Sequence, residues 1–416
     1  MTQTAQALSP TLTSTQREAT AQVVPRKKAQ AVVIGSGFGG LAAAVRLGAR
    51  GYQVRVFEKL DAPGGRAYVY HQDGFVFDAG PTIITAPFLL EELWELCGKK
   101  LEDDIDLREM SPYYRIRFDD GEYFDYGGDH EAMKAEIARF NPDDVAGYER
   151  FLEAAVQVYA VGFDQLLSIS FDSLWKMVRV LPELVRVQFY RSVYGLVSRY
   201  IKHPKLRMVF SFHPLLVGGN PFSTTAVYTL IAQLERRHGV HFAMGGTGSV
   251  VNGLVGLIEA QGGKVRCNAP VEKILNEGRR AVGVRLASGE EVRADVIVSN
   301  ADSAATYRYL VDPSVRRRWT NRRLARARYS MSLFVWYFGT DRQYPDVAHH
   351  MMLLGERYRG LLDDIFARQV LAEDFSLYLH RPTATDPSMA PPGCDAFYVL
   401  SPVPHMDAGV DWQETG

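Results

Sequence analysis

The sequence contains few cysteines and no long hydrophobic run. Its 416 residues include only three cysteines, Cys97, Cys267 and Cys394, and none of them forms a C-x-x-C pair. The sequence therefore predicts neither a disulfide framework nor a zinc site, and it fits a reducing compartment. No apolar run reaches the ~18 residues of a membrane-spanning helix, so we expect no such helix.

An excess of charge of either sign is also missing. The 47 Lys and Arg residues nearly balance the 48 Asp and Glu residues, which gives a net charge of −1. This balance argues against nucleic acid as a partner. The 47% of hydrophobic residues is typical of a globular protein. Because the chain is too long for one simple core, we expect two intertwined domains.

Two further patterns exclude other chemistry. The glycine-rich stretch at residues 245–249 lacks the G-K-[ST] ending of a P-loop, so the sequence excludes nucleoside triphosphate hydrolysis. His349 and His350 are adjacent, and on a strand they would point to opposite faces, so they would not share a metal ion. The sequence predicts no metal site. His213, which precedes a proline, is a ligand, a base or a hydrogen-bonded structural residue, and the last is favoured.

Residues 31–44 carry the clearest motif. An apolar run of strand length meets a glycine-rich turn and then an alanine-rich segment of helix composition. The spacing is G-x-G-x-x-G, in which the glycines permit a tight turn, close approach to a pyrophosphate and close helix–strand packing. The amide groups and positive dipole end of the helix would face the phosphates. The glycines of this turn are Gly35, Gly37, Gly39 and Gly40.

An acidic residue follows at the position that this motif requires. The second strand, residues 53–57, ends in Glu58, which lies 18 residues after Gly40. That is near the ~20 residues expected for the acid that accepts hydrogen bonds from a ribose hydroxyl, and an acid here disfavours NADP. Lys59 is adjacent. The alternative is an ordinary alanine–glycine turn with Glu58 as a solvated strand end.

A second glycine pair comes shortly after the acid, at Gly64-Gly65-Arg66. A long flavin dinucleotide needs the chain to pass close to its pyrophosphate there, and Arg66 can offset the phosphate charge in a bidentate contact. The alternative is a surface β-turn. A third stretch, F-D-A-G-P-T at residues 77–82, has a short and rigid backbone that can approach a flat ring closely.

Two basic stretches raise the question of a membrane surface. Residues 171–202 interleave large apolar side chains with basic ones, which indicates helices that lie on an anionic membrane or, equally, two amphipathic helices packed on the core. Arginines crowd residues 316–328, where a solvated helix face is favoured over a membrane contact and over nucleic acid.

The remaining segments predict a discontinuous organisation. Residues 262–299 read as two hairpins followed by a buried strand that returns to the nucleotide domain, and residues 332–338, 375–379 and 397–400 read as strands of a second sheet. We expect an α/β fold of mixed α+β character: a Rossmann-like FAD-binding domain and a discontinuous substrate domain with a mixed sheet and helices. The predicted parts are a disordered tail at 1–28, the FAD domain at 29–112 and 240–310, and a substrate and membrane-associating domain at 113–239 and 311–416.

Several stretches together resemble the bacterial and fungal phytoene desaturases, which are amine-oxidase-like flavoproteins. The resemblance rests on G-S-G-F-G-G-L-A-A-A, A-P-G-G-R-A-Y-V-Y, F-D-A-G-P-T, L-L-V-G-G-N-P-F, V-S-N-A-D and S-P-V-P-H, spread over residues 31–405. It implies FAD, an acyclic C40 polyene substrate and stepwise dehydrogenation with hydride transfer to the flavin N5. It also implies peripheral association with the inner face of the cell membrane in the cytoplasm, and a quinone or oxygen as electron acceptor.

The resemblance also assigns residues to the cofactor. It matches Val271 to the backbone contact with adenine and places residues 78–82 beside the reactive ring. Arg179 is a candidate catalytic residue at the mouth of the substrate tunnel. The predicted cofactor-binding residues are Gly35, Gly37, Gly39, Gly40, Glu58, Lys59, Gly64, Gly65, Arg66, Asp78, Gly80, Pro81, Thr82 and Val271.

Two kinds of alternative stay open at this point. One is another flavoenzyme of the same fold, namely a carotenoid isomerase or oxygenase or an amine oxidase. The other belongs to a different class and is a non-catalytic isoprenoid-binding chaperone of the same fold. The chain ends at Gly416 without the P-G-A-G-I-P-G-like segment that the resemblance implies, so we expect a truncated chain with weakened FAD retention and activity.

Overall fold

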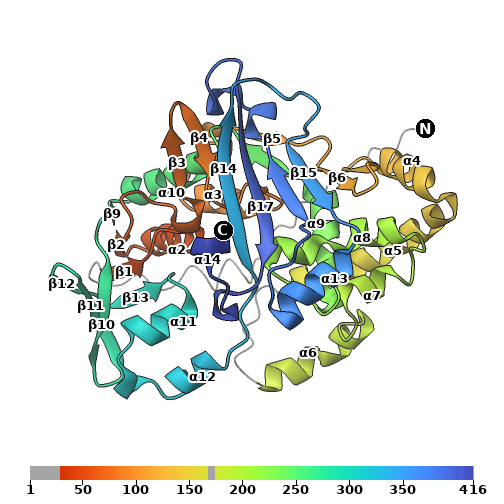
Figure 1. Ribbon diagram of the computed structural model, residues 1–416. Coiled ribbons are helices and arrows are strands. Elements are labelled where there is room, and N and C mark those ends of the chain that lie inside the picture. The colour runs from red at the N-terminus through yellow and green to blue at the C-terminus, as the bar shows by residue number, and fades with distance from the viewer. Residues whose placement is uncertain (1–28, 167–173, 416) are drawn as a thin grey trace, which may run out of the picture. The chain divides into compact units, whose positions relative to one another are not determined.

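The computed structural model describes residues 29–166 and 174–415 (Figure 1). The predicted disordered tail at residues 1–28 lies outside the described residues. The chain divides into two compact units. Of the described residues, the first unit takes 29–65, 96–98 and 254–324, and the second takes 66–95, 99–166, 174–253 and 325–415.

A parallel sheet forms the centre of the first unit. Its strand order is β13–β1–β2–β9, and every neighbouring pair is parallel. Residues 31–33 are fully buried, as expected of a parallel sheet covered on both faces. Helix α2 (Phe38–Ala49) connects β1 to β2, which confirms the predicted strand–turn–helix–strand order. The strands are β1 (Gln30–Ile34), β2 (Gln53–Phe57), β9 (Lys264–Arg266) and β13 (Val296–Ser299).

An antiparallel sheet completes the first unit. Strand β11 (Arg280–Leu286) lies between β10 (Val271–Glu277) and β12 (Glu291–Arg293). Its apolar face packs with Val32 and Phe57 in one hydrophobic cluster. The chain then enters β13, so the two predicted hairpins and the returning strand are confirmed, although β13 is half-buried where a buried strand was predicted. The helical segments after β13 are α11 (Ser303–Ala305), η7 (Thr306–Leu310), η8 (Pro313–Val315) and α12 (Asn321–Ala325).

The second unit is built on a mixed six-stranded sheet of order β14–β17–β16–β15–β6–β7 (Figure 1). Only the β15–β6 pair is parallel. The three strands predicted for a second sheet, β14, β16 and β17, all lie in it. Its strands are β6 (Tyr114–Phe118), β7 (Tyr123–Tyr126), β14 (Ser332–Thr340), β15 (His350–Leu354), β16 (Leu377–His380) and β17 (Asp395–Val403). Two smaller pairs are β3 (Val69–Gln72) with β4 (Phe75–Asp78), and β5 (Leu107–Glu109) with β8 (His241–Ala243).

Helices and this sheet bury an aromatic core in the second unit. Tyr114, Phe124, Phe151, Phe210 and Phe212 are all at most 1% exposed and belong to one cluster. The helices are α3 (Pro87–Glu95), α4 (His130–Phe140), α5 (Val145–Tyr159), α6 (Leu174–Arg186), α7 (Val193–Val197), α8 (Pro204–Ser211), α9 (Leu230–His238), α13 (Tyr358–Asp363) and α14 (Trp412–Thr415), and α10 (Thr247–Ala260) contributes to both units. Shorter helical turns are η1 (Gly65–Ala67), η2 (Leu101–Asp103), η3 (Pro142–Asp144), η4 (Ala160–Gln165), η5 (His213–Val217), η6 (Ala226–Thr229), η9 (Asp364–Arg368), η10 (Pro382–Ala384), η11 (Pro387–Met389) and η12 (Met406–Ala408).

The predicted mixed α/β class is therefore confirmed. Among the described residues, no helix combines the length and the apolar character needed to cross a bilayer.

Candidate cofactor site

The glycine turn of the first unit is as tight as the motif requires. Gly35 has φ +89°, and a side chain at Gly40 would place its Cβ 2.1 Å from the Gly35 carbonyl oxygen. Only glycine fits this contact. Helix α2 begins directly after Gly37, and no side chain caps it. The amide groups of its first turn are therefore available to an anion.

The second glycine pair lies against the first. The Gly64 amide donates to the Ser36 carbonyl over 3.1 Å, and Gly64 is buried. A Cβ on Gly65 would lie 3.3 Å from the Cα of Gly37, and both glycines of the pair have positive φ angles. A surface β-turn is therefore wrong for Gly64-Gly65, since the pair packs on the nucleotide-type turn.

Glu58 is a buried anion held by its own chain. Its carboxylate is 3% exposed and accepts hydrogen bonds from the Ser36 amide (2.8 Å), the Ser36 hydroxyl (2.7 Å) and the Leu60 amide (3.0 Å). Burial alone would raise the pKa of Glu58, but the hydrogen bonds outweigh it and hold the pKa below its usual value. The solvated strand end is therefore wrong. A carboxylate has about four acceptor positions, so acceptor capacity remains for a hydroxyl ligand.

The neighbouring segment is fixed to the same strand end. The Ala269 amide donates to the Glu58 carbonyl over 2.8 Å, two residues before Val271 begins β10. Val271 is half-buried, and Lys59 is exposed next to Glu58. The first unit thus brings together the glycine turn, the second glycine pair and Glu58, and ties the segment before Val271 to the same strand end.

Sequence reasoning missed Asn300, which follows β13. Its side chain fills the space that side chains on the glycine turn would need: a Cβ at Gly37, Gly39 or Gly40 would lie 2.9, 2.6 or 3.1 Å from it. Strand β13 pairs with β1, so Asn300 lies at the carboxyl edge of the parallel sheet, where such folds bind ligands. The V-S-N-A-D stretch after a predicted buried strand was the available signal.

The predicted residues of the second unit begin with Asp78 at the end of β4. The Thr247 amide donates to Asp78 Oδ1 over 2.9 Å, so this carboxyl group lies at the start of α10. Asp78 is 1% exposed, and its Oδ2 atom is buried without a hydrogen-bond partner. Burial outweighs the hydrogen bonds from residues 247 and 248 and raises the pKa of Asp78 to about 6.

The backbone after Asp78 is tightly constrained. A Cβ on Gly80 would lie 2.2 Å from the Arg66 carbonyl oxygen. The Thr82 hydroxyl is within 3.1 Å of the Tyr398 hydroxyl and 3.3 Å of the Tyr378 hydroxyl. Thr82 is therefore engaged with the six-stranded sheet, whereas Arg66 and Pro81 are exposed.

Arg179 lies on α6 and its side chain is exposed. No hydrogen bond or ion pair from the described residues holds it in place. Its predicted catalytic role stays a prediction.

The first unit fits an anionic dinucleotide. Its glycine turn offers uncapped amides to phosphate, and Glu58 offers an ionised carboxylate to a ribose. The Gly35 carbonyl oxygen leaves no room for a side chain at Gly40, and the Asn300 side chain lies beside Gly37 and Gly39.

Comparisons with known proteins agree with this fit. Residues 38–399 match the family of flavin-containing amine oxidoreductases. The chain is 49% identical over 389 residues to a neurosporene-forming phytoene desaturase of Cereibacter sphaeroides. The aligned region covers 92% of this chain and 75% of that protein. It is 48% identical over 387 residues to a lycopene-forming phytoene desaturase of Paracoccus sp., covering 93% and 77% respectively.

Solved structures share the fold at much lower identity. A Pyrococcus furiosus protein superimposes with a TM-score of 0.60 at 18% identity, covering 93% of this chain and 84% of that one. A putrescine oxidase variant gives a TM-score of 0.57 at 16% identity, covering 93% and 78%. The predicted flavin cofactor, FAD, and the predicted oxidoreductase class are confirmed by the family. The chain belongs to the flavin-containing amine oxidoreductases and, among them, to the phytoene desaturases.

Proposed function

We propose that this protein is an FAD-dependent phytoene desaturase that converts phytoene to more unsaturated acyclic carotenes of the neurosporene or lycopene type. The observation that carries the proposal is the 49% identity over 389 residues, which extends through both units. The glycine turn and the buried anion Glu58 support the cofactor part of the proposal.

We assign nucleotide binding to the first unit and the substrate to the second. When bound, FAD would supply the oxidising power by accepting a hydride from an allylic carbon, while the neighbouring carbon would lose a proton. The α2 amides would hold the dinucleotide, and Glu58 would orient its ribose. A substrate without polar groups would be positioned in the second unit by apolar contacts.

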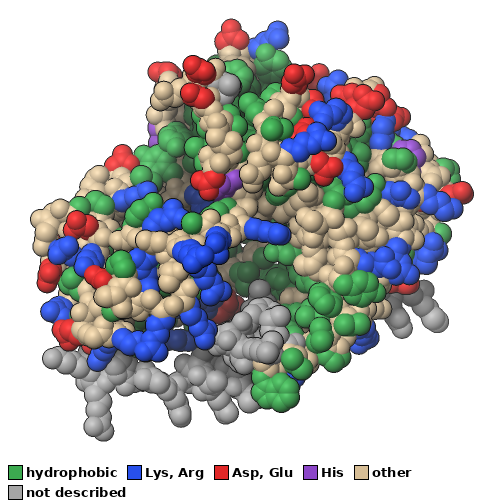
Figure 2. Space-filling model, turned by 60° about the horizontal axis from the view of Figure 1, so that its bottom comes forward, with side chains coloured by type: hydrophobic (Ala, Val, Ile, Leu, Met, Phe, Trp, Pro, Cys, Tyr) green, Lys and Arg blue, Asp and Glu red, His purple; other side chains and the backbone are tan. Residues whose placement is uncertain are grey.

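The finer part of the proposal is the contact with the membrane. Helix α6 exposes Trp175 (78%), Val178 (46%), Leu181 (44%) and Val185 (49%), which recur at helical spacing on one face. Figure 2 shows hydrophobic side chains gathered on the α6 side of the molecule. Four large apolar residues left in water on one helix face indicate a surface that inserts into an interface.

The basic residue Arg179 on the same helix would contact anionic headgroups or the substrate entrance. We propose that the protein works in the cytoplasm on the inner face of the cell membrane, where a C40 hydrocarbon is dissolved, and that a quinone or oxygen accepts the electrons.

The membrane contact is tested by sedimentation with anionic lipid vesicles. The Trp175→Ser variant is expected to bind several-fold more weakly than the unchanged protein. The matched variant Tyr309→Ser removes a ring that is 69% exposed on the other unit and should bind normally. Equal binding by all three proteins would contradict the α6 assignment.

The catalytic proposal is tested by adding phytoene in vesicles to the FAD-loaded protein without oxygen or quinone. The visible flavin absorbance should fall as substrate is oxidised and return when a quinone or oxygen is admitted. Absorbance that stays constant with phytoene but falls with a chemical reductant would refute the proposed substrate.

A further inference from the structure

Three histidines converge in the interior of the second unit. His349, His350 and His380 are 7%, 1% and 1% exposed, and one ring nitrogen from each lies within 4.8 Å of the others. His350 and His380 are direct partners on the antiparallel strands β15 and β16. His349 precedes β15, so strand alternation does not apply to it, and the expectation that His349 and His350 diverge is wrong.

In these three rings only two of the six nitrogen atoms have a hydrogen-bond partner. His349 Nδ1 lies 2.6 Å from the Thr385 hydroxyl, and His350 Nδ1 lies 2.7 Å from the Tyr378 hydroxyl. The Nε2 atoms of both rings, and both ring nitrogens of His380, are buried without a partner. Buried polar atoms are rarely left unpaired, because a buried donor or acceptor without a partner destabilises the fold.

This pattern is typical of metal-ligating histidines. In such sites one ring nitrogen is held by an outer partner while the other binds the ion, and the outer partner fixes the tautomer and the ring orientation. Here hydroxyl groups hold the Nδ1 atoms of two rings, which leaves their Nε2 atoms available.

We propose that His349, His350 and His380 bind one divalent transition-metal ion of the zinc class. Imidazole nitrogen suits zinc and its neighbours, whereas magnesium and calcium require oxygen ligands, and the cluster contains no carboxylate. Three protein ligands leave a fourth position for water. Zinc–nitrogen bonds of about 2.0–2.1 Å place tetrahedral ligands roughly 3.3 Å apart, so the rings must close by up to about 1.5 Å.

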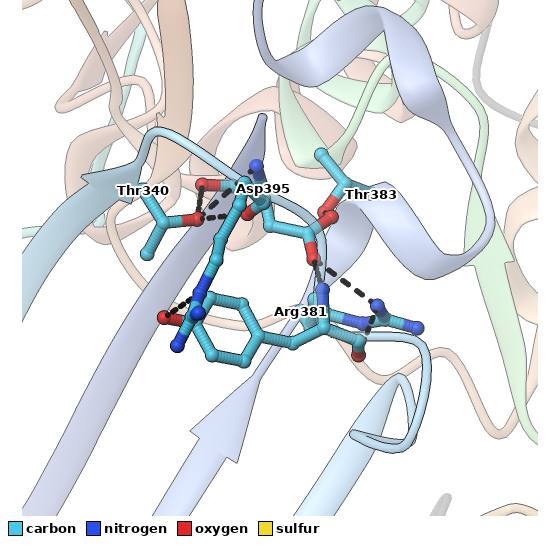
Figure 3. A network of polar contacts seen from close by, with 6 residues as sticks. Thr340, Arg381, Thr383 and Asp395 are labelled. Atoms are coloured by element: carbon cyan, nitrogen blue, oxygen red, sulfur yellow. Dashed lines mark hydrogen bonds and ion pairs between the residues drawn. The ribbon is translucent and has the colours of Figure 1, made fainter. Parts of the chain in front are cut away.

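The surroundings tolerate a cation despite a nearby arginine. Arg381 follows His380, but its guanidinium group is paired with Asp395 over 3.1 Å (Figure 3). Asp395 also accepts a hydrogen bond from the Thr383 hydroxyl over 2.6 Å. The Asp395 carboxylate therefore offsets part of the positive charge of Arg381.

A bound ion would be coordinated by the neutral imidazole form of each ring. The ion would join β15, β16 and the segment before β15.

The test measures the metal content of the FAD-loaded full chain. The protein is exposed to Zn²⁺, dialysed against metal-free buffer and analysed by mass spectrometry for metals. The unchanged protein should retain about one zinc per chain, and His380→Ala and His350→Ala should lose it. His71→Ala, which removes an exposed histidine on β3, is the matched control and should retain it.

A second measurement does not depend on whether the alanine variants fold. X-ray absorption at the zinc edge identifies the atoms that surround zinc in the unchanged protein. It should show nitrogen neighbours at about 2.0 Å. The proposal is overturned if the unchanged protein retains no zinc, if His380→Ala retains as much as His71→Ala, or if the bound zinc has only oxygen neighbours.

Discussion

Asp78 gives the sharpest prediction about stability, because it is a buried acid with one satisfied oxygen. Its Oδ1 atom accepts from the Thr247 amide, whereas Oδ2 has no partner and the side chain is 1% exposed. The Asp78→Asn substitution keeps an oxygen acceptor for Thr247 and removes the charge. The comparison therefore isolates what ionisation of Asp78 does to the fold.

The magnitude follows from the pKa. The carboxyl group has a pKa of about 6 in the folded protein and about 3.9 when unfolded. The folded state holds the proton more tightly, so the associated stability is fully present below the unfolded pKa and is lost as the pH rises through about 6. Two pKa units at 1.36 kcal/mol each amount to about 3 kcal/mol in total, of which about 2 kcal/mol is lost between pH 4 and pH 7, because the unfolded group is already half ionised at pH 4.

The assay is guanidinium unfolding at a series of pH values for the unchanged protein and for Asp78→Asn. Relative to the unchanged protein, Asp78→Asn should gain about 2 kcal/mol in the free energy of unfolding between pH 4 and pH 7. A pH-independent offset from its new amide group is expected as well. Asp73→Asn, in the exposed turn of the same hairpin, is the matched control. A difference for Asp78→Asn that stays flat with pH would refute the reasoning.

Two further substitutions test the interior of each unit. Gly40→Ala would place a Cβ 2.1 Å from the Gly35 carbonyl oxygen and should greatly reduce the flavin retained per chain, measured from absorbance. Gly256→Ala meets no atom within 4 Å and should retain flavin normally. Tyr114→Phe removes a 2.7 Å hydrogen bond to the fully buried Glu235 and should lower the free energy of unfolding by about 1–3 kcal/mol. A loss below about 0.5 kcal/mol would contradict that account.

The nucleotide unit could be predicted from the sequence because its signals are local. An apolar strand, a glycine turn, an alanine-rich helix and an acid at fixed spacing all lie within residues 31–58. The structure confirms this order and buries Glu58. His213 was also predicted well as a structural residue, since its Nε2 lies 3.1 Å from the buried Glu235 carboxylate.

Other features depend on contacts between distant segments. Asn300 reaches the glycine turn only because β13 pairs with β1, about 265 residues earlier in the chain. The histidine cluster depends on the register of β15 with β16 and on a strand that begins at His350. Hydrophobic periodicity along the chain reveals neither the strand register nor the residue at which β15 begins, so the sequence predicted no metal site.

The helix boundaries show the same limit on a smaller scale. The chain forms a 3₁₀ turn, η6, from Ala226 and becomes the α-helix α9 only at Leu230. The residue pattern is the same for both forms of helix, and the packing of the segment decides between them.

The central claim is that this protein introduces double bonds into phytoene. The most direct measurement is to incubate the FAD-loaded protein with phytoene in lipid vesicles and a quinone, extract the lipids and record the visible spectrum. The account predicts new long-wavelength polyene bands, whose positions report the number of conjugated double bonds. Unchanged phytoene recovered from protein that carries its full complement of flavin would contradict it.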